Sequence, residues 1–363
     1  MHKFIFTLTI LLAATSCLRN SSADDQSAKG GDKANSSYVV KDVDPSLFLT
    51  GDSRVKVSKV KCTLSDGTST MCLQIESKSN PSDHQMGPWC PDNIADGPEA
   101  GGIWLKDGKV YDVDGAFIKN LASFFGDNKW QMYDSKGNVF VTQTKEDCEN
   151  AANPNVGPEY ANYCVECLPS YVANITQTYR IPITPVKLST PSDLGRNGRP
   201  GGGQGPPPDR QRGDRQGPPP NGERPGDGND PGGGQGGGGH AVRGIAFNGV
   251  RFDAPAPVDA ILGAYTLAPF DDAGGHINPA AGYHYHAATG KSKEVSQSDG
   301  HAPMIGYAMD GHGLFALLDE NGKEPVGLDE CRGHYDETRG YHYHVDAAGN
   351  NNFINCLQGA VAE

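Results

Sequence analysis

Alternating hydrophobic and polar positions predict β-strands along much of the chain, and no segment has the spacing of a long amphipathic helix. The clearest example is a pair of segments, Val55 to Cys62 and Met71 to Ile75, that flank an Asp66-Gly67 dipeptide. Successive side chains of a strand point to opposite faces, so this pattern is typical of strands with one buried face. We expect a hairpin turning at Asp66-Gly67 and, over the whole chain, a mainly β protein with a β-sandwich-like fold.

Similar patterns predict further strands, interrupted only by short helical segments. Turn residues such as Asp310-Gly311 separate neighbouring strands. Pro182 and Pro185 fall within one predicted strand, and proline restricts a strand to a sheet edge or an irregular position. The additional predicted strands cover residues 103–105 and 109–113, which form a hairpin, and residues 176–188, 305–309 and 313–318. Single short helices are predicted at residues 117–125 and 145–152.

The amino-terminal segment has the pattern of an export signal. Its apolar run from Phe4 to Ala14 is shorter than the roughly 20 residues that a membrane-spanning helix needs. The run ends in Ala-Thr-Ser-Cys, which is similar to a bacterial lipobox, in which Cys17 becomes the lipid-modified first residue. The alternative is a plain signal peptide cleaved near Ser16. We expect a lipoprotein-type signal at residues 1–17 and a polar, disordered tether at residues 18–37.

A second segment without hydrophobic periodicity, residues 191–239, divides the chain. It is rich in Gly and Pro and contains no aromatic residue, so it buries too little apolar surface to offset the entropy lost on ordering. We expect it to be disordered. Two organisations remain open: a linker between a Cys-containing region at 38–190 and a second domain at 240–363, or a long insertion between two strands of one fold.

The charge balance excludes one class of partner. The chain has 31 Lys and Arg against 44 Asp and Glu, a formal net charge of −13, whereas a nucleic-acid binder needs a positive surface to meet phosphates. Attachment to anionic lipid by charge alone is excluded for the same reason. We expect no nucleic-acid partner and membrane attachment through the lipid on Cys17. This anchor places an exported protein in the cell envelope, at the outer membrane or the cell surface.

Nine cysteines also point to an oxidising compartment. Setting Cys17 aside leaves eight, an even number that favours disulfides in an exported chain, although eight cysteines allow about 105 pairings. Cys62 and Cys72 would lie opposite each other in the predicted hairpin, and Cys331 and Cys356 are the only two after residue 240. The Cys164-Val-Glu-Cys167 spacing leaves open a redox or zinc site, with structural disulfides favoured.

Two histidine-rich units with identical spacing occur after residue 240. Each reads Asp-[Asp/Glu]-x-x-Gly-His, then five residues, then Gly-Tyr-His-Tyr-His, over residues 271–286 and again over residues 329–344. Equivalent positions are 58 residues apart. We interpret the two units as an internal duplication.

A strand with the sequence Tyr-His-Tyr-His places both histidines on one face and both tyrosines on the other. A third histidine from a nearby segment would complete a three-imidazole site, which suits Zn²⁺ or copper. We therefore predict a transition metal cofactor. The predicted ligands are His276, His284 and His286 in the first unit, His334, His342 and His344 in the second, and, with less support, His301 between them.

Three aspartates, Asp271, Asp310 and Asp329, are candidate acceptors that orient the ligand rings. The alternative to a metal site is a hydrogen-bonded network of His, Asp and Tyr that joins two hairpins. His312 is interpreted as structural, and His84 as a loop anchor beside a disulfide or, less simply, as a further ligand.

The chain resembles the YHYH domain-containing proteins, a family named for this tetrapeptide. The resemblance is carried by both Tyr-His-Tyr-His segments and by Asn248 to Phe252, His301 to Tyr307 and Phe353 to Cys356, and Met86 to Cys167 looks like the corresponding part of bacterial, lipoprotein-type members. The chain departs from the family at His312-Gly313, where an aromatic residue and a proline are usual. It also has Ala273 where the second unit has Cys331. The resemblance implies a shared fold and no defined reaction.

Three functions are consistent with these features. The first is an exported, lipid-anchored metal-binding protein that uses the duplicated three-histidine motif. The second is a metalloenzyme on the same residues, either a zinc hydrolase or a copper oxidoreductase, for which the sequence identifies no catalytic residue. The third is a surface interaction module in which the histidines are structural. The first is favoured, and its small-molecule or protein partner is not identified by the sequence.

Overall fold

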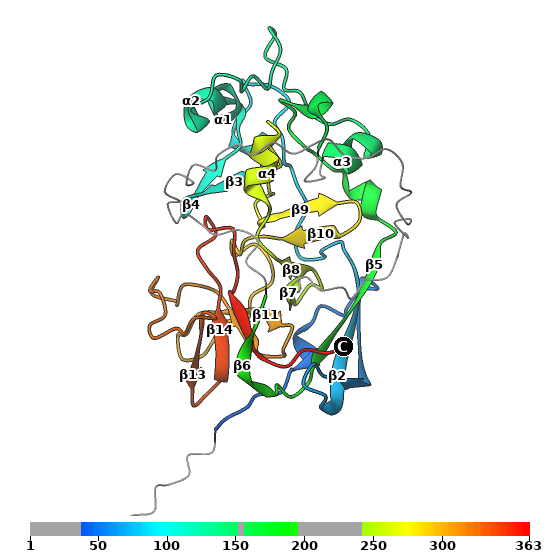
Figure 1. Ribbon diagram of the computed structural model, residues 1–363, viewed down its shortest axis with the longest axis vertical. Helices are drawn as coiled ribbons and strands as arrows, with labels where there is room; N and C mark the ends of the chain where they lie inside the picture. Colours follow the sequence, from blue (N-terminus) through cyan, green and yellow to red (C-terminus); the bar gives the residue numbers. More distant parts are fainter. Residues whose placement is uncertain (1–37, 152–155, 195–241) are drawn as a thin grey trace, which may run out of the picture. The chain divides into compact units, whose positions relative to one another are not determined.

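An eight-stranded mixed β-sheet, formed by the chain after residue 241, organises the computed structural model (Figure 1). Its central strands, β7 (Val242–Ala246) and β11 (Met304–Ala308), pair antiparallel, with Ile245 opposite Tyr307. On each side, the central strand pairs with the next strand in the sequence to form a hairpin. The second strand of that hairpin runs parallel to the nearer strand of another hairpin, which forms the edge of the sheet. In spatial order the strands are β13 (Gly333–Asp336), β14 (Gly340–His344), β12 (Gly313–Phe315), β11 (Met304–Ala308), β7 (Val242–Ala246), β8 (Arg251–Asp253), β10 (Gly282–Tyr285) and β9 (Gly275–Asn278).

The structure describes residues 38–151, 156–194 and 242–363. The predicted signal segment with Cys17, the tether at residues 18–37 and residues 195–239 of the Gly/Pro-rich segment lie outside this part. Tyr38 to Glu363 forms one compact unit. Within the described part of the chain, no helix is both long enough and apolar enough to cross a membrane.

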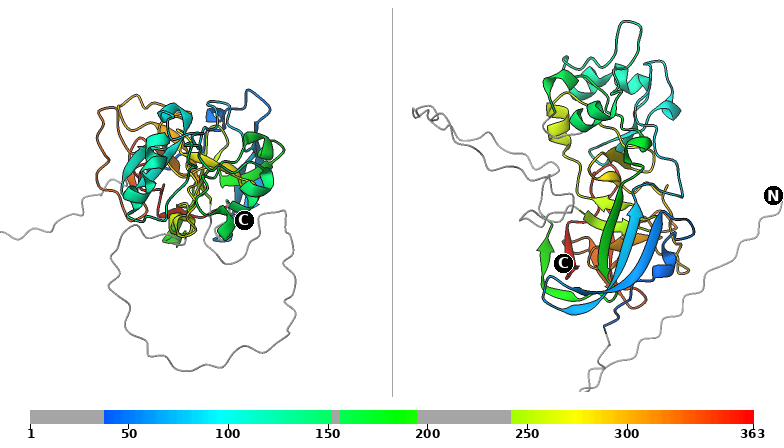
Figure 2. Two further views of the ribbon diagram at one scale, coloured as in Figure 1. Left: turned by 90° about the horizontal axis from the view of Figure 1, so that it is seen from above. Right: turned by 90° about the vertical axis from the view of Figure 1, so that its right-hand side faces the viewer.

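A three-stranded antiparallel sheet packs against the centre of the eight-stranded sheet. Its strands are β1 (Val55–Thr63), β2 (Ser69–Lys78) and β5 (Thr176–Pro182), in that order, drawn in blue and green in the right-hand view of Figure 2. Leu73, Ile75 and Ile181 point into one buried cluster together with Ile245 and Phe247 of the large sheet. This face-to-face contact makes the fold sandwich-like, and the prediction of a mainly β protein is confirmed.

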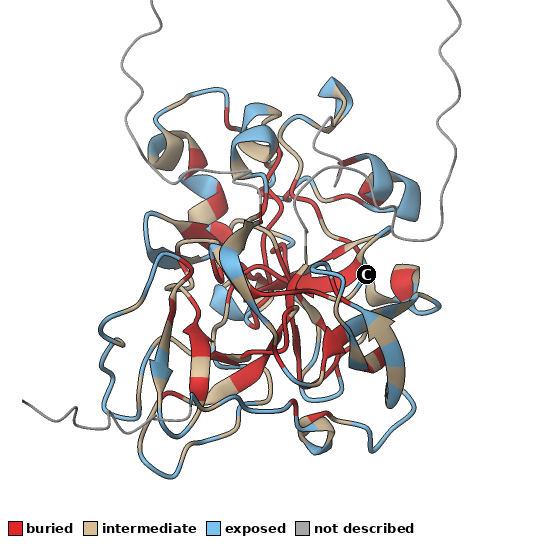
Figure 3. Ribbon diagram, turned by 60° about the horizontal axis from the view of Figure 1, so that its bottom comes forward, coloured by how far each residue is buried: buried red, intermediate tan, exposed pale blue. Residues whose placement is uncertain are grey.

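A second, larger core joins the Cys-containing region to the outer strands of the eight-stranded sheet. Trp104, Met132 and Val165 belong to the same buried cluster as Phe252 and Tyr285. Buried residues accordingly gather in the central strands, while exposed residues lie in the surrounding loops and short helices (Figure 3).

Between β2 and β5, the described chain has little regular structure besides one small hairpin, three short α-helices and single 3₁₀ turns. Residues 117–125, predicted as one helix, form two helices because the chain breaks at Asn120, which caps the first of them through its backbone N–H. The elements are β3 (Ile103–Lys106), β4 (Lys109–Asp112), α1 (Gly115–Lys119), α2 (Leu121–Phe125) and α3 (Lys145–Ala151). The remaining helices of the described chain are α4 (Val258–Gly263) and the 3₁₀ turns η1 (Pro45–Leu47), η2 (Pro98–Ala100), η3 (Pro158–Tyr160) and η4 (Pro169–Val172).

The strand predicted at residues 176–188 is divided. β5 ends at Pro182, although Ile183 N–H still donates to Met71 O of β2. Proline has no N–H to donate to a ladder, and a separate strand β6 (Lys187–Asp193) follows Pro185. β6 pairs antiparallel with β15 (Cys356–Gly359) at the end of the chain, so ordered structure continues past residue 190.

Four disulfides cross-link the described residues. They join Cys62 to Cys72, Cys90 to Cys164, Cys148 to Cys167 and Cys331 to Cys356. The first and last are the two pairs that the sequence favours. The Cys164-x-x-Cys167 spacing serves two separate structural disulfides, so the redox or zinc alternative for it is wrong.

The sequence predicts that Cys62 and Cys72 lie directly opposite each other in the hairpin, and this register is wrong. Cys62 faces Thr70 and Cys72 faces Val60, because the loop closes with Leu64 N–H donating to Thr68 O and so centres the turn on residue 66. The two cysteines are diagonal neighbours, with Cα atoms 5.8 Å apart.

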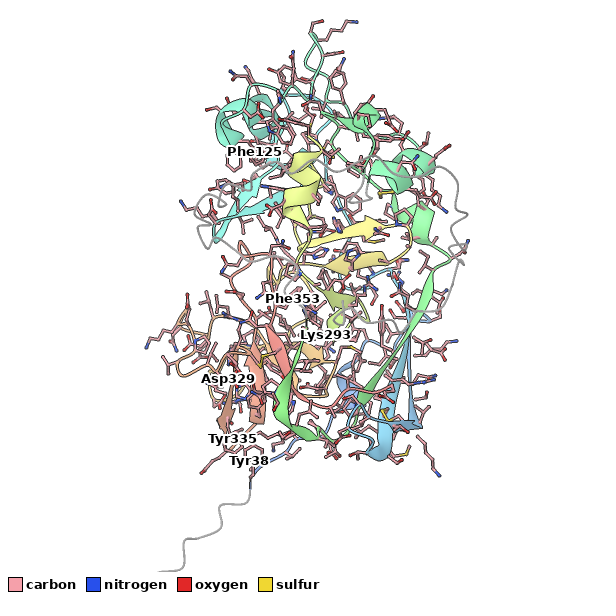
Figure 4. The ribbon with its side chains drawn as sticks, viewed as in Figure 1. Tyr38, Phe125, Lys293, Asp329, Tyr335 and Phe353 are labelled. Atoms are coloured by element: carbon pink, nitrogen blue, oxygen red, sulfur yellow. A yellow bond between two sulfur atoms is a disulfide. The ribbon has the colours of Figure 1, made fainter. Side chains whose placement is uncertain are left out.

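The first described residues pack against β13, the edge strand of the β13–β14 hairpin. Tyr38 stacks on Tyr335 of β13 with ring centroids 4.6 Å apart, and the two rings lie together in Figure 4. The backbone N–H of Val39 donates to the Tyr335 hydroxyl. These contacts cover a strand whose outer side has no partner strand in the eight-stranded sheet.

Candidate metal centres

Two β-hairpins bring the predicted histidines together, and they do so with the same register. In each hairpin, the histidine that follows the first glycine lies opposite the first histidine of Tyr-His-Tyr-His: His276 opposite His284, and His334 opposite His342. The second histidine of that segment is two residues further along its strand and therefore lies on the same face. The alternation of faces that the sequence predicts for Tyr-His-Tyr-His therefore brings the three histidines of each hairpin to one face.

The glycines of the motif are explained by backbone geometry and by packing. Gly282 and Gly340 begin the Tyr-His-Tyr-His strands with φ of +73° and +69°, in the left-handed region that glycine occupies without strain. Gly275 and Gly333 pair with the second tyrosine of the motif across the hairpin, and a Cβ atom on either would overlap the ring of the first tyrosine. Each glycine therefore allows its hairpin to close at the observed register.

The first cluster consists of His276, His284 and His286. One nitrogen from each ring lies within 4.8 Å of the others, and the Nε2 atoms of His276 and His284 are 3.2 Å apart. The Nδ1 atoms of His284 and His286 lie 3.0 Å and 2.7 Å from the carbonyl oxygens of Gly282 and Ala254. These bonds fix two of the three rings with Nε2 directed into the cluster.

The second cluster has four members. It contains His301, His334, His342 and His344, again with one nitrogen of each ring within 4.8 Å of the others. The Nε2 atom of His342 is 3.0 Å from that of His334 and 3.1 Å from that of His301. His301, the candidate with less support in the sequence, therefore supplies a fourth nitrogen here.

All four rings of the second cluster are held in the same way. Their Nδ1 atoms lie 2.9–3.1 Å from backbone carbonyl oxygens, which accept hydrogen bonds from them. A neutral imidazole that donates from Nδ1 carries a lone pair on Nε2. Four lone pairs then converge, and neighbouring lone pairs at about 3 Å repel each other unless a cation lies between them. The Nε2 atom of His344 is buried and has no hydrogen-bond partner among the described residues.

The distances between these nitrogens suit a bound transition metal ion. Zn–N bonds of about 2.0–2.1 Å place two nitrogens of a tetrahedral site roughly 3.3 Å apart. The Nε2–Nε2 distances of 3.0–3.2 Å in the two clusters are close to this value. The donor sets of both clusters are therefore compatible with metal binding without large rearrangement.

Burial keeps most of these imidazoles in the neutral form that binds metals. Burial lowers the pKa of His286 and of His344 to about 3 and that of His342 to about 4. The pKa values of His276 and His284 are also lowered well below the usual range, first by burial. At neutral pH these rings hold no proton that a metal ion would have to displace.

Each cluster also has a carboxylate at its edge that the sequence analysis missed. The Asp253 carboxylate lies 3.9 Å from His284 Nε2, and the Asp336 carboxylate lies 3.9 Å from His342 Nε2. Asp253 is paired with Arg251 at 2.6 Å. Asp253 comes from β8, which is adjacent in space to β10 but 31 residues away in sequence, so no local motif signals it.

The three predicted orienting aspartates contact the tyrosines instead of the ligand rings, so that prediction is wrong. Asp271 accepts from the Tyr283 hydroxyl at 2.9 Å, and Asp329 accepts from the Tyr341 hydroxyl at 2.9 Å. Both also accept from backbone N–H groups of the turn before their hairpins. The tyrosines occupy the opposite face of the strand from the histidines, and the aspartates lie on that face.

Asp310 makes the third such contact. Its carboxylate accepts from the Tyr343 hydroxyl at 2.6 Å and from the Gly359 N–H at 2.9 Å, and His312 Nδ1 lies 3.0 Å away. Burial opposes ionisation of this carboxyl, but the contacts with His312 and Tyr343 outweigh it and lower its pKa. His312 is therefore structural, as the sequence indicates, and carbonyl oxygens take the orienting role at the ligand rings.

His84 joins the Cys-containing region to the first hairpin on its tyrosine face. Its Nε2 atom lies 3.2 Å from the Tyr283 hydroxyl and 3.4 Å from the Tyr285 hydroxyl, and its Nδ1 atom lies 2.9 Å from Asp83. Asp83 also accepts from Asn248 Nδ2 at 2.9 Å. His84 is thus a loop anchor outside the first cluster.

We expect Asp83→Asn to destabilise the protein by about 2 kcal/mol at pH 7. Burial raises the pKa of Asp83, but hydrogen bonds from His84, Asn248 and Lys293 N–H outweigh it and hold the pKa at about 2. A carboxyl with a lowered pKa stabilises the folded state above its unfolded pKa of about 3.9 and loses that contribution as the pH falls through 2. Urea unfolding of both proteins at pH 7 and pH 3 measures the difference.

The difference between the Asp83→Asn variant and the wild type should be smaller at pH 3 than at pH 7. Asp66→Asn, at an exposed turn position, is the matched control and should change stability little at pH 7. An equal loss from Asp83→Asn at both pH values would contradict an ionic contribution.

Comparison with known proteins gives one result for this region. Residues 235–325 match the family model described as YHYH protein. The matched segment contains the first cluster and His301, and the hairpin β13–β14 follows it. The chain matches no curated protein and no solved structure.

Proposed function

We propose, from the YHYH domain that residues 235–325 carry, that this chain is an exported metal-binding protein with two centres, one at each histidine cluster. The observation that supports this most strongly is the second cluster. Four imidazoles direct Nε2 to one point, and each ring is fixed by a backbone carbonyl at Nδ1. A hydrogen-bonded network without metal would need protons between these nitrogens, and the lowered pKa values of most of the rings oppose protonation.

The donor set favours zinc or copper as the metal. Imidazole nitrogen suits both ions, whereas calcium and magnesium prefer oxygen ligands. The second cluster offers four nitrogens, which matches the closed tetrahedral geometry of a structural Zn²⁺ site. His301 comes from the loop before β11 and the other three ligands from the hairpin β13–β14, so a bound ion would link two segments of the chain.

The proposed location is the cell envelope, with the protein held to a membrane by a lipid on Cys17. The disulfides are consistent with an oxidising compartment. The net charge of −13 favours a partner other than nucleic acid. A tether at residues 18–37 would separate the anchored end from the compact unit that begins at Tyr38.

Elemental analysis of protein spanning residues 38–363 tests the metal proposal. We expect about two equivalents of zinc or copper per chain after metal-replete expression and removal of loosely bound metal. His286→Ala should lose one equivalent, and His342→Ala/His344→Ala should lose the other. His84→Gln, at a histidine outside both clusters, is the control and should keep two. Wild-type protein that is folded and free of transition metal would overturn the proposal.

A further inference from the structure

The two clusters differ in how many ligands they offer and in what lies beside them. The second supplies four imidazole nitrogens, enough to complete a tetrahedral ion. The first supplies three, and all three of its histidines line a cavity of about 240 Å³. A tetrahedral ion at the first cluster would therefore have one coordination position without a histidine ligand.

The walls of this cavity are apolar except near the histidines. Val165, Ile261 and Ile277 contribute apolar surface, as does Trp89. The polar side chains that line it, besides the histidines, are Arg251, Asp253 and Asn278. Pockets for drug-sized ligands measure about 300–1,000 Å³, so this cavity fits only a small molecule.

The charges at the polar end favour an anion. Three neutral imidazoles leave the charge of a divalent ion uncompensated. The single negative charge of Asp253 is already paired with Arg251 at 2.6 Å. The Nε atom of Arg251 is buried without a hydrogen-bond partner among the described residues. An anion in the open position would meet both the ion and a guanidinium, and charge–charge attraction between such partly buried groups is stronger than in bulk water.

We propose that the first cluster is an open metal centre that takes the carboxylate of a small, apolar organic acid, while the second is closed. The carboxylate lies at the ion near Arg251, and the hydrocarbon part lies against Val165, Ile261 and Ile277. The inference rests on the proposed metal binding and goes beyond it by naming the ligand class and the cluster that takes it.

Cobalt-substituted protein provides the test, because a fourth ligand changes the visible absorption of Co²⁺. The probes are Co²⁺ alone, then acetate, propionate and butyrate added to the protein spanning residues 38–363. We expect each acid to change the spectrum and affinity to rise about fourfold for each added methylene, the factor for burying one such group. Inorganic phosphate is the comparison anion and should bind more weakly than butyrate.

Variants locate the effect at the first cluster. Protein with His342→Ala/His344→Ala, which keeps only the first cluster, should respond to butyrate as the wild type does. Protein with His286→Ala, which keeps only the second, should bind Co²⁺ without responding. Arg251→Gln should weaken butyrate binding about tenfold while the cobalt content of the first cluster is kept.

Asn278→Asp is the most specific test, because the second hairpin already has an aspartate at the equivalent position of the same turn. The Asn278 side chain accepts from the N–H groups of residues 280 and 281, and Asp336, at the equivalent position of the second hairpin, accepts from those of residues 338 and 339. The substitution therefore preserves the turn and adds a negative charge to the cavity wall. Butyrate binding should fall at least tenfold, with Co²⁺ still bound.

The outcomes separate the two proposals. Two equivalents of Co²⁺ with no spectral response to any acid would overturn the open centre and leave the metal proposal standing. A response that is equal for phosphate and butyrate, or that persists in His286→Ala, would overturn the assignment of ligand class or of cluster. Folded protein that binds no Co²⁺ would overturn the metal proposal itself.

Discussion

Removing bound metal is expected to lower the free energy of unfolding by about 4 kcal/mol for each cluster, when free metal otherwise exceeds its dissociation constant about a thousandfold. The ion stabilises only the folded state, because the seven ligands are brought together by strand pairing and by the approach of His301. Without it, lone pairs only 3.0–3.2 Å apart repel each other. Unfolding in guanidinium chloride with and without a strong chelator measures the loss.

The contribution of each cluster can be separated in the same experiment. His342→Ala/His344→Ala protein should lose only the contribution of the first cluster when chelator is added. The disulfides remain intact throughout, so the change reports metal and not reduction. Chelator that removes both equivalents without changing stability would contradict a metal contribution to folding and would favour a histidine network that is stable by itself.

Asp310→Ala is expected to destabilise the protein by about 3–5 kcal/mol, the cost of breaking a buried charged network. Asp310 is fully buried and joins three segments: its own turn between β11 and β12, Tyr343 of β14, and Gly359 of β15. Its removal leaves a buried hydroxyl and a buried N–H without an acceptor. Chemical unfolding at pH 7 measures this loss.

Asp310→Asn is the matched variant, since Asn248 occupies the corresponding turn beside the first hairpin and contacts Tyr285 there. It should lose less than Asp310→Ala because the amide oxygen still accepts. The pKa of Asp310 is lowered in the folded state, so its ionic contribution is present above about pH 4 and is lost as the pH falls below that value. A neutral effect of Asp310→Ala at pH 7 would contradict this account.

The sequence predicts the two hairpins well because their determinants are local. Glycine at a turn and alternation along a strand decide where the Tyr-His-Tyr-His histidines point, and the spacing within each unit places the third histidine across the hairpin. Membership of His301 in the second cluster is weakly signalled because it depends on how the loop before β11 passes over the sheet. That path is set by tertiary packing.

Tertiary packing also explains why the sequence does not identify Asp253 and Arg251 as neighbours of the first cluster. Asp253 and Arg251 lie beside the first cluster because β8 runs parallel to β10, and parallel pairing between distant segments leaves no periodic pattern in sequence. Asp271 and Asp329 are expected from the sequence to orient the ligand rings. They instead bind their own turn and the tyrosine face, and backbone carbonyls hold the rings.

The pairing of β7 with β11 resembles the interface of a two-fold symmetric dimer contained within one chain, since Ile245 and Tyr307 face each other across an antiparallel centre. Either half of the large sheet alone would expose one side of its central strand as an unpaired edge, which is a template for pairing with another molecule. The connection through residues 286–303 keeps the two edges at high effective concentration for each other. Cleavage of that connection would therefore convert an internal contact into a route to self-association.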